Sequence, residues 1–222
     1  MRKFVPVLAA IAASAAVVAL PATTAYATTH VLTINRVGGR AVAVGAILKA
    51  KLVPKTKAVF SLGTGTAKLT CGSAHVSATV KRNPTVPGKA RESLTAIGTS
   101  KCTFSGITGV TFKSIKAQNL PYKATVSDAA GFPVKVSGQS STKPIKFTVK
   151  VAVGMTTITC NYKASSVTGK ASNTGNKITF SKQKFTKAAG SNALCVGPAF
   201  FSAKFGPVRD TSVMLSPRVF VN

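Results

Sequence analysis

Hydrophobic and polar residues alternate along much of the chain. Every second residue from Phe147 to Val153 is Phe or Val, and the residues between them are mostly polar. Segments 76–81, 122–126 and 177–180 show the same period of two. Because successive side chains of a β-strand point to opposite faces, this period predicts half-buried strands. We expect these strands to follow one another with no helix between them.

Turn-forming residues separate the alternating segments at short intervals. Short strands between clusters of Gly, Pro and Asn are typical of an antiparallel β-sandwich or β-barrel. Segment 41–52 is the one candidate helix, but Gly45 and the β-branched residues around it favour a strand. We therefore predict an all-β fold. The turn clusters lie at 38–39, 63–65, 83–84, 87–88, 106–109, 173–175 and 197–198.

Four cysteines indicate a disulfide framework. None of them forms the close C-x2-C pair that structural zinc sites use, so zinc is the weaker alternative. Four cysteines allow three pairings. We predict the sequential one, which closes two loops of similar length and stabilises the fold by about 3 to 4 kcal/mol per loop. The predicted disulfides are Cys71 with Cys102 and Cys160 with Cys195.

The cysteines also outline an internal repeat. Residues 68–71 resemble residues 157–160, and a second Cys follows each motif after a similar interval. This spacing suggests two similar lobes, each with one disulfide, although chance similarity between β-rich segments is an open alternative. The predicted boundaries are an N-terminal β lobe at 28–138, a surface connector at 139–144 and a C-terminal β lobe at 145–222.

The N-terminus has the three parts of a cleavable secretory signal peptide. Residues 1–27 contain a basic start with Arg2 and Lys3, an apolar run, and a final A-x-A sequence at 25–27. The apolar run is shorter than the ~20 residues of a membrane span, which disfavours a retained anchor. We therefore expect a secreted, extracellular protein in an oxidising environment that favours disulfides.

The composition leaves few side chains for catalysis or metal binding. The chain contains 3 acidic residues and 2 His. Glu92 follows Arg91 in the sequence, and a neighbouring cation favours an ionised carboxylate, the opposite of a general acid. Asp210 likewise follows Arg209, and His75 falls on the polar face of a predicted strand. We expect no enzymatic activity, no metal ion and no cofactor.

The strong positive charge predicts an anionic partner. Lys and Arg total 30 and the net charge is +27, while 45% of the residues are hydrophobic, enough for a folded core. Such a surface gathers polyanions in a salt-dependent way. Lys outnumbers Arg and Trp is absent, which favours loose contact over specific nucleic-acid recognition. We expect teichoic-type phosphates or an acidic lipid surface of the cell envelope as the partner. The predicted polyanion-binding residues are Lys113, Lys116, Lys123, Lys135, Lys146, Lys150, Lys177, Lys182, Lys184 and Lys187.

Two other functions stay open. A carrier of a small apolar ligand needs a lined cavity, and a membrane-active antimicrobial protein needs an apolar edge. The Phe-rich C-terminus, with Phe200, Phe201, Phe205 and Phe220, bears on both. The alternation of Phe201, Ala203 and Phe205 with polar residues predicts a core strand there rather than an exposed edge.

Several segments together resemble a group of small exported actinobacterial proteins of unassigned function. They are the signal peptide, the start RVGGRAVAVG at 36–45, the two Thr-Cys motifs, the sequence NLPY at 119–122 and the Phe-rich C-terminus. The likeness covers most of the mature chain. It implies export and a disulfide-linked β fold, and it implies no site residues.

Overall fold

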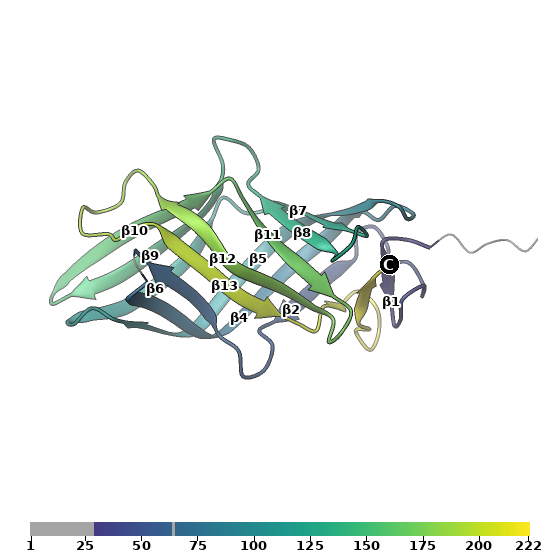
Figure 1. The fold of residues 1–222 in the computed structure, drawn as a ribbon, viewed down its shortest axis with the longest axis horizontal. Helices are drawn as coiled ribbons and strands as arrows, with labels where there is room; N and C mark the ends of the chain where they lie inside the picture. The colour runs from purple at the N-terminus through teal and green to yellow at the C-terminus, as the bar shows by residue number, and fades with distance from the viewer. Residues whose placement is uncertain (1–28, 64) are drawn as a thin grey trace, which may run out of the picture.

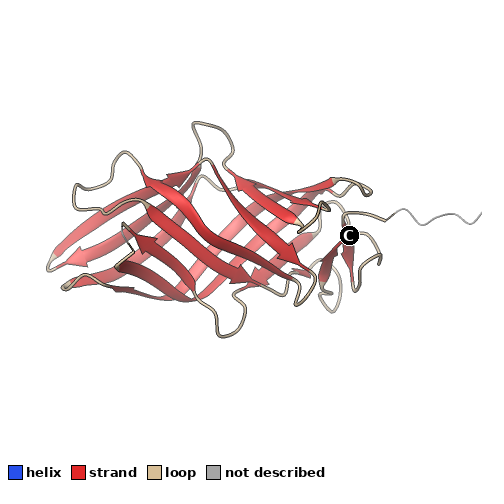
Figure 2. Cartoon of the chain, viewed as in Figure 1, coloured by secondary structure: helices blue, strands red, loops and turns tan. Residues whose placement is uncertain are grey.

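The computed structural model describes residues 29–63 and 65–222, so the predicted signal peptide at 1–27 lies outside the described residues. The described part consists of strands β1 to β15 joined by turns and loops, with no helix (Figure 2). The predicted all-β fold is confirmed. Accordingly, this part holds no helix of the length and hydrophobicity needed to cross a bilayer.

Eight antiparallel strands form a closed barrel (Figure 1). Around the ring the order is β8, β7, β5, β4, β3, β13, β12 and β11, and β11 pairs with β8 to complete it. Closure leaves the ring without an unpaired edge. The strands are β3 (Ala58–Leu62), β4 (Ala67–Arg82), β5 (Lys89–Ser105), β7 (Tyr122–Ser127), β8 (Pro133–Ser137), β11 (Ser166–Ser172), β12 (Lys177–Lys187) and β13 (Ala199–Phe205).

A three-stranded extension lengthens the barrel at one end. β6 (Val110–Gln118), β9 (Ile145–Val153) and β10 (Thr156–Ala164) pair in the order β6, β9, β10, and β10 joins β12 where Tyr162 faces Lys187. These strands lie at the left of Figure 1. We call this the hairpin end, and it includes the β9–β10 turn, the β5–β6 turn at 106–109 and the loop at 188–198.

A small second sheet covers the opposite end of the barrel. It consists of β1 (Leu32–Ile34) and β15 (Val219–Val221), which bring the two ends of the described chain together at the right of Figure 1. The buried side chain of Asn83 accepts a hydrogen bond from the Leu32 N–H at 2.9 Å and donates to the carbonyl oxygens of Leu32 and Val42 at 2.8 and 2.9 Å. We call this the capped end.

Short strands beside β4 complete the wall next to the capped end. β2 (Ile47–Lys51) pairs with both β4 and β14 (Arg209–Asp210). The strand predicted for 41–52 is therefore confirmed only at Ile47–Lys51. The preceding residues turn instead, because Gly45 adopts a positive φ of 89°, which a strand residue does not.

The two predicted lobes share one sheet rather than forming separate ones. Residues 139–144 form a loop, but β8, before this loop, pairs with β11, after it, and β3 likewise pairs with β13. Each segment alone would leave open strand edges, and pairing with the other segment satisfies their backbone hydrogen-bonding groups. The predicted connector therefore does not separate two units of the sheet.

Both predicted disulfides are confirmed, and each lies within one of the predicted segments. Cys71–Cys102 joins β4 to β5 at directly opposite positions, and Cys160–Cys195 joins β10 to the loop before β13. Two disulfides fit folding in an oxidising environment.

Of the C-terminal aromatic residues, Phe201 and Phe205 pack in the barrel core, as predicted, whereas Phe200 and Phe220 belong to none of the core clusters. The rings of Phe60 and Phe201 lie 4.7 Å apart between centroids, and Phe60 also contacts Phe147 and Phe185 edge-on. Phe205 is buried further along β13. These aromatic side chains lie in the middle of the barrel, between its two ends.

Candidate functional site

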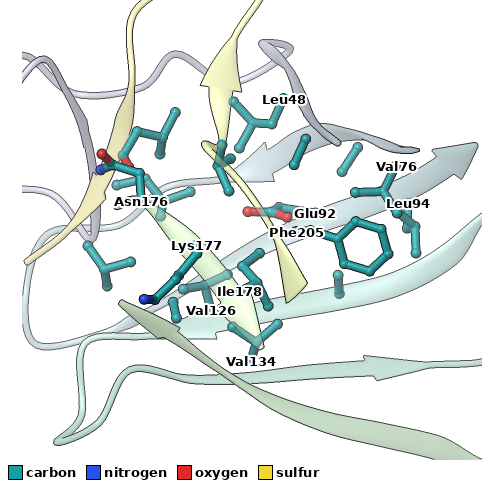
Figure 3. Close-up of a pocket in the computed structure, with 18 of the residues that line it drawn as sticks. Leu48, Val76, Glu92, Leu94, Val126, Val134, Asn176, Lys177, Ile178 and Phe205 are labelled. Carbon is teal, nitrogen blue, oxygen red and sulfur yellow. The ribbon is translucent and has the colours of Figure 1, made fainter. Parts of the chain in front are cut away.

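A cavity of about 100 Å³ lies inside the barrel at the capped end (Figure 3). The β1–β15 sheet covers it with Leu32, Val219 and Val221, and the barrel wall surrounds it with further aliphatic side chains. Because the residues that β4, β7 and β8 contribute to this lining are all Ala or Val, the wall does not fill the space it encloses.

One carboxyl group enters this apolar space. Glu92 lies on β5, where its neighbours across the sheet are Val80 on β4 and Ala124 on β7. Burial raises the pKa of the Glu92 carboxyl to about 7, and no hydrogen bond or charge among the described residues counteracts that rise. The carboxyl is therefore close to half ionised at neutral pH.

The prediction that Arg91 would hold Glu92 ionised is wrong. Arg91 and Glu92 are consecutive strand residues, so their side chains leave opposite faces of β5. Arg91 is exposed on the outer face, while Glu92 lines the cavity. The sequence does contain the correct signal, because Ala90, Glu92 and Leu94 share one face with a period of two.

The other acidic side chains serve the fold. Asp128 accepts a hydrogen bond from the Gly88 N–H at 2.7 Å, and the buried Asp210 accepts one from the Ser212 N–H at 2.9 Å. Of the three acids, Glu92 is the one whose carboxyl is left for another molecule.

The neutral polar residues at the margin of the cavity hold the cap in place. Asn173 donates to the Val221 carbonyl at 2.7 Å and accepts from the Val221 N–H at 2.9 Å. Asn176 donates to the Val219 carbonyl at 2.8 Å. Since these amides already bond to β15, they are not free for a ligand, whereas the Glu92 carboxyl forms no hydrogen bond with the described residues.

A second cavity of about 70 Å³ continues from the first along the barrel. Its far wall is aromatic, with Phe60, Phe147 and Phe185. Together the two cavities form an elongated apolar space with the carboxyl near one end. The residues that line both are Val76, Leu94, Val136, Phe180 and Phe205.

A third cavity, of about 260 Å³, lies at the hairpin end. Unlike the first two, it reaches exposed apolar side chains, among them Ile107, Val153 and Leu194. The loop beside it is fixed by the Cys160–Cys195 disulfide and by a hydrogen bond from the Tyr162 hydroxyl to the Val196 carbonyl. Its lining contains no ionisable group other than this tyrosine, whose pKa burial raises to about 12.

The predicted polyanion-binding lysines lie on β6, β7, β8, β9 and β12 and do not converge on one pocket. Lys146 is half-buried, and so is Lys177, which lines the capped-end cavity rather than a solvent-facing strand face. Lys184 and Lys187 border a shallow open groove beside Pro198. The exposed members of the set are Lys113, Lys116, Lys123, Lys135, Lys150, Lys182, Lys184 and Lys187.

Among residues 29–63 and 65–222, no three His, Cys, Asp or Glu side chains gather where they could hold a metal ion. The interior therefore offers recognition by shape, apolar contact and one carboxyl. No family model, no curated protein and no solved structure matches this chain.

Proposed function

We propose that this is an exported, non-enzymatic protein that binds a small apolar ligand inside its barrel. The observation that supports it is the elongated apolar space under the cap, with one carboxyl that the fold leaves without a partner. Ligand sites of this kind are concave, mostly apolar, and contain a few placed polar groups.

The physical reason is the poor packing of the interior. Small cavities with an apolar lining hold no water, and the atoms that line them lose dispersion contacts. A ligand that fills the space restores those contacts without displacing ordered water. Empty apolar cavities of about 150 Å³ bind benzene or xenon in other proteins, so the volumes here suit small or slender ligands.

Native mass spectrometry tests this proposal directly. The protein would be exported by a bacterial host and purified without detergent, and its mass compared with the mass after denaturation. The folded protein should also bind xenon or benzene, seen as chemical-shift changes of residues that line the cavities. A folded protein that carries no adduct and binds neither probe would contradict the proposal.

A cavity-filling variant with a matched control sharpens the test. Ala78 lines the capped-end cavity, so Ala78→Leu should abolish probe binding there, and Ala171→Leu offers a second position. Ala130 is exposed and lines none of the three cavities, so Ala130→Leu should leave binding unchanged.

A second function concerns the outer surface, and we propose it on the outward lysines. They would hold the protein to anionic polymers or lipid headgroups of the cell envelope by many weak, salt-sensitive contacts. The two functions are compatible, because one uses the outer face of the strands and the other the inner face. Sedimentation with acidic liposomes or isolated cell walls at low salt, and its loss in molar salt, tests the second. Binding that persists in molar salt would overturn it.

A further inference from the structure

We propose that the ligand of the capped-end cavity is a slender apolar amine whose ammonium group pairs with Glu92. This inference rests on the proposed interior binding and names the class of ligand. The geometry is plain in Figure 3, where the Glu92 carboxyl points into a space bounded by aliphatic side chains and Phe205.

No cation among residues 29–63 and 65–222 pairs with this carboxyl. Two charged residues other than Glu92 line the cavity, Lys49 on β2 and Lys177 on β12. Lys49 is exposed, and in Figure 3 the Lys177 amine points away from Glu92. Neither forms an ion pair with it among the described residues.

The remaining surroundings of Glu92 are uncharged on every element packed against it. β4, β7, β8, β13 and β15 contribute only hydrocarbon to the lining, and the β11–β12 turn contributes amides that already bond to the cap. Such surroundings give a carboxylate no hydrogen-bond donor or positive charge of their own. An ammonium group is the ligand group that meets this need most strongly, because a charge-assisted hydrogen bond is about twice as strong as a neutral one.

The shape of the interior defines the rest of the ligand. The two cavities are adjacent and share part of their walls, with Glu92 in the lining of the first and Phe60, Phe147 and Phe185 in that of the second. An unbranched alkyl or monoaromatic chain fits this elongated space, and its polar group must stand at the end near the cap. We therefore take n-hexylamine as the probe, with n-hexanol and hexanoate as probes of the same length.

Proton release distinguishes this pairing from simple burial of an alkyl chain. Below pH 7 the free carboxyl is mostly protonated, so binding an ammonium group must expel a proton to solvent. At pH 6 hexylamine binding should release close to one proton, measured by calorimetry in buffers of different ionisation enthalpy. Its affinity should rise about tenfold per pH unit up to pH 7 and then level off. Hexanol binding should release no proton.

Glu92→Gln provides the decisive variant and Asp128→Asn its matched control. Both remove one negative charge, but Asp128 lies outside the cavity and bonds to Gly88. Glu92→Gln should weaken hexylamine binding about 10- to 100-fold at pH 8 and abolish proton release. Asp128→Asn should leave both unchanged, and hexanol affinity should be similar in all three proteins.

The outcomes separate this inference from the function it rests on. Hexanol or hexanoate binding in the absence of hexylamine binding would overturn the amine assignment and leave interior binding intact. Hexylamine binding that is equal in the wild-type protein and Glu92→Gln would overturn it as well. If none of the probes binds, including xenon and benzene, both the proposed interior binding and the amine assignment are wrong.

Discussion

The capped end and the hairpin end enclose apolar space in different ways. At the capped end, hydrogen bonds from Asn83, Asn173 and Asn176 to the backbone hold the β1–β15 sheet over a cavity that contains a carboxyl. At the hairpin end, a disulfide fixes a loop beside a larger cavity that reaches exposed apolar side chains. Different strands line the two spaces, and β5 alone contributes to both, with Glu92 and Leu94 at the capped end and Phe104 at the hairpin end.

The two ends differ in their lining, because a carboxyl is present at the capped end and absent from the hairpin-end cavity. Both ends also have exposed apolar residues, such as Met214 and Leu215 near the cap and Met155 and Leu194 at the hairpin end. Exposure of apolar side chains therefore does not by itself identify a site. What singles out the capped end is a carboxyl group that lines an apolar cavity and forms no hydrogen bond or ion pair with the described residues.

The largest expected effect comes from breaking the cap. Asn83→Ala would leave the Leu32 N–H and the Val42 carbonyl without partners, while the Leu32 carbonyl keeps its bond from the Val42 N–H, and we expect a loss of about 4 kcal/mol in the free energy of unfolding. Water entering under the loosened cap would also lower the pKa of Glu92 towards its ordinary value. Denaturant unfolding gives the free energy, and NMR titration gives the pKa.

A matched asparagine at the hairpin end serves as the control. Asn192 is exposed and accepts one hydrogen bond, from the Leu194 N–H at 2.9 Å. Asn192→Ala should cost less than about 1 kcal/mol and leave the pKa of Glu92 in place. An equal loss of unfolding free energy in Asn83→Ala and Asn192→Ala would contradict the proposed difference between the capped end and the hairpin end.

Removing the hairpin-end disulfide should have the next largest effect. Cys160 and Cys195 are 35 residues apart, and replacing both by Ala should cost about 3 kcal/mol through the entropy of the unfolded chain. The loop at 188–198 should then exchange its amide hydrogens faster, while the capped end stays protected. Faster exchange of β1 and β15 as well would show that the two ends do not close independently.

The pH dependence of stability tests Glu92 itself. Its pKa is raised from 4.5 to about 7, so the folded state binds more protons than the unfolded state between these values. Stability should therefore fall as the pH rises from 4.5 to 7 and lose about 3 kcal/mol in total. Glu92→Gln should remove this slope and be the more stable protein at pH 9. Identical pH profiles for the two proteins would contradict the account.

The smallest effect is expected at exposed apolar positions. Leu194 and Leu215 are 70% and 89% exposed, so replacing either by Ser should change stability by less than about 0.5 kcal/mol. Leu194 lines the hairpin-end cavity and Leu215 lines none of the three. Benzene binding at the hairpin end should therefore weaken in Leu194→Ser alone. Val149 and Val151 line this cavity, so their chemical shifts would report the weaker benzene binding.

The sequence predicts the strands and disulfides well because both follow from local or pairwise regularities. The alternation at 145–153 and at 199–205 fixes which side chains point inward, and the similar spacing of the cysteines indicates their pairing. The pairing of β8 with β11 is not visible in the sequence, because backbone hydrogen bonds join strand edges whatever their side chains are. For the same reason the closed ring across residues 139–144 could not be foreseen.

The site was missed for a different reason. Because Arg91 and Glu92 are adjacent in the sequence, we expected the arginine to keep the carboxyl ionised. The alternation of a strand instead places Glu92 on the same face as Ala90 and Leu94. The cavity itself depends on how many small side chains meet from eight strands, which no single segment records. The residues two positions before and after Glu92 are apolar, and this pattern indicates that the carboxyl points to the inner face of the sheet.

Site-resolved ¹³C NMR of the Glu92 carboxyl tests the account most directly. The chain contains a single Glu, so selective labelling gives one signal to follow across pH. We predict a midpoint near pH 7 in the free protein and a lower midpoint once n-hexylamine is bound. A midpoint at the ordinary 4.5 with and without the amine would mean that water already solvates the carboxyl, and the dry ligand cavity would not exist.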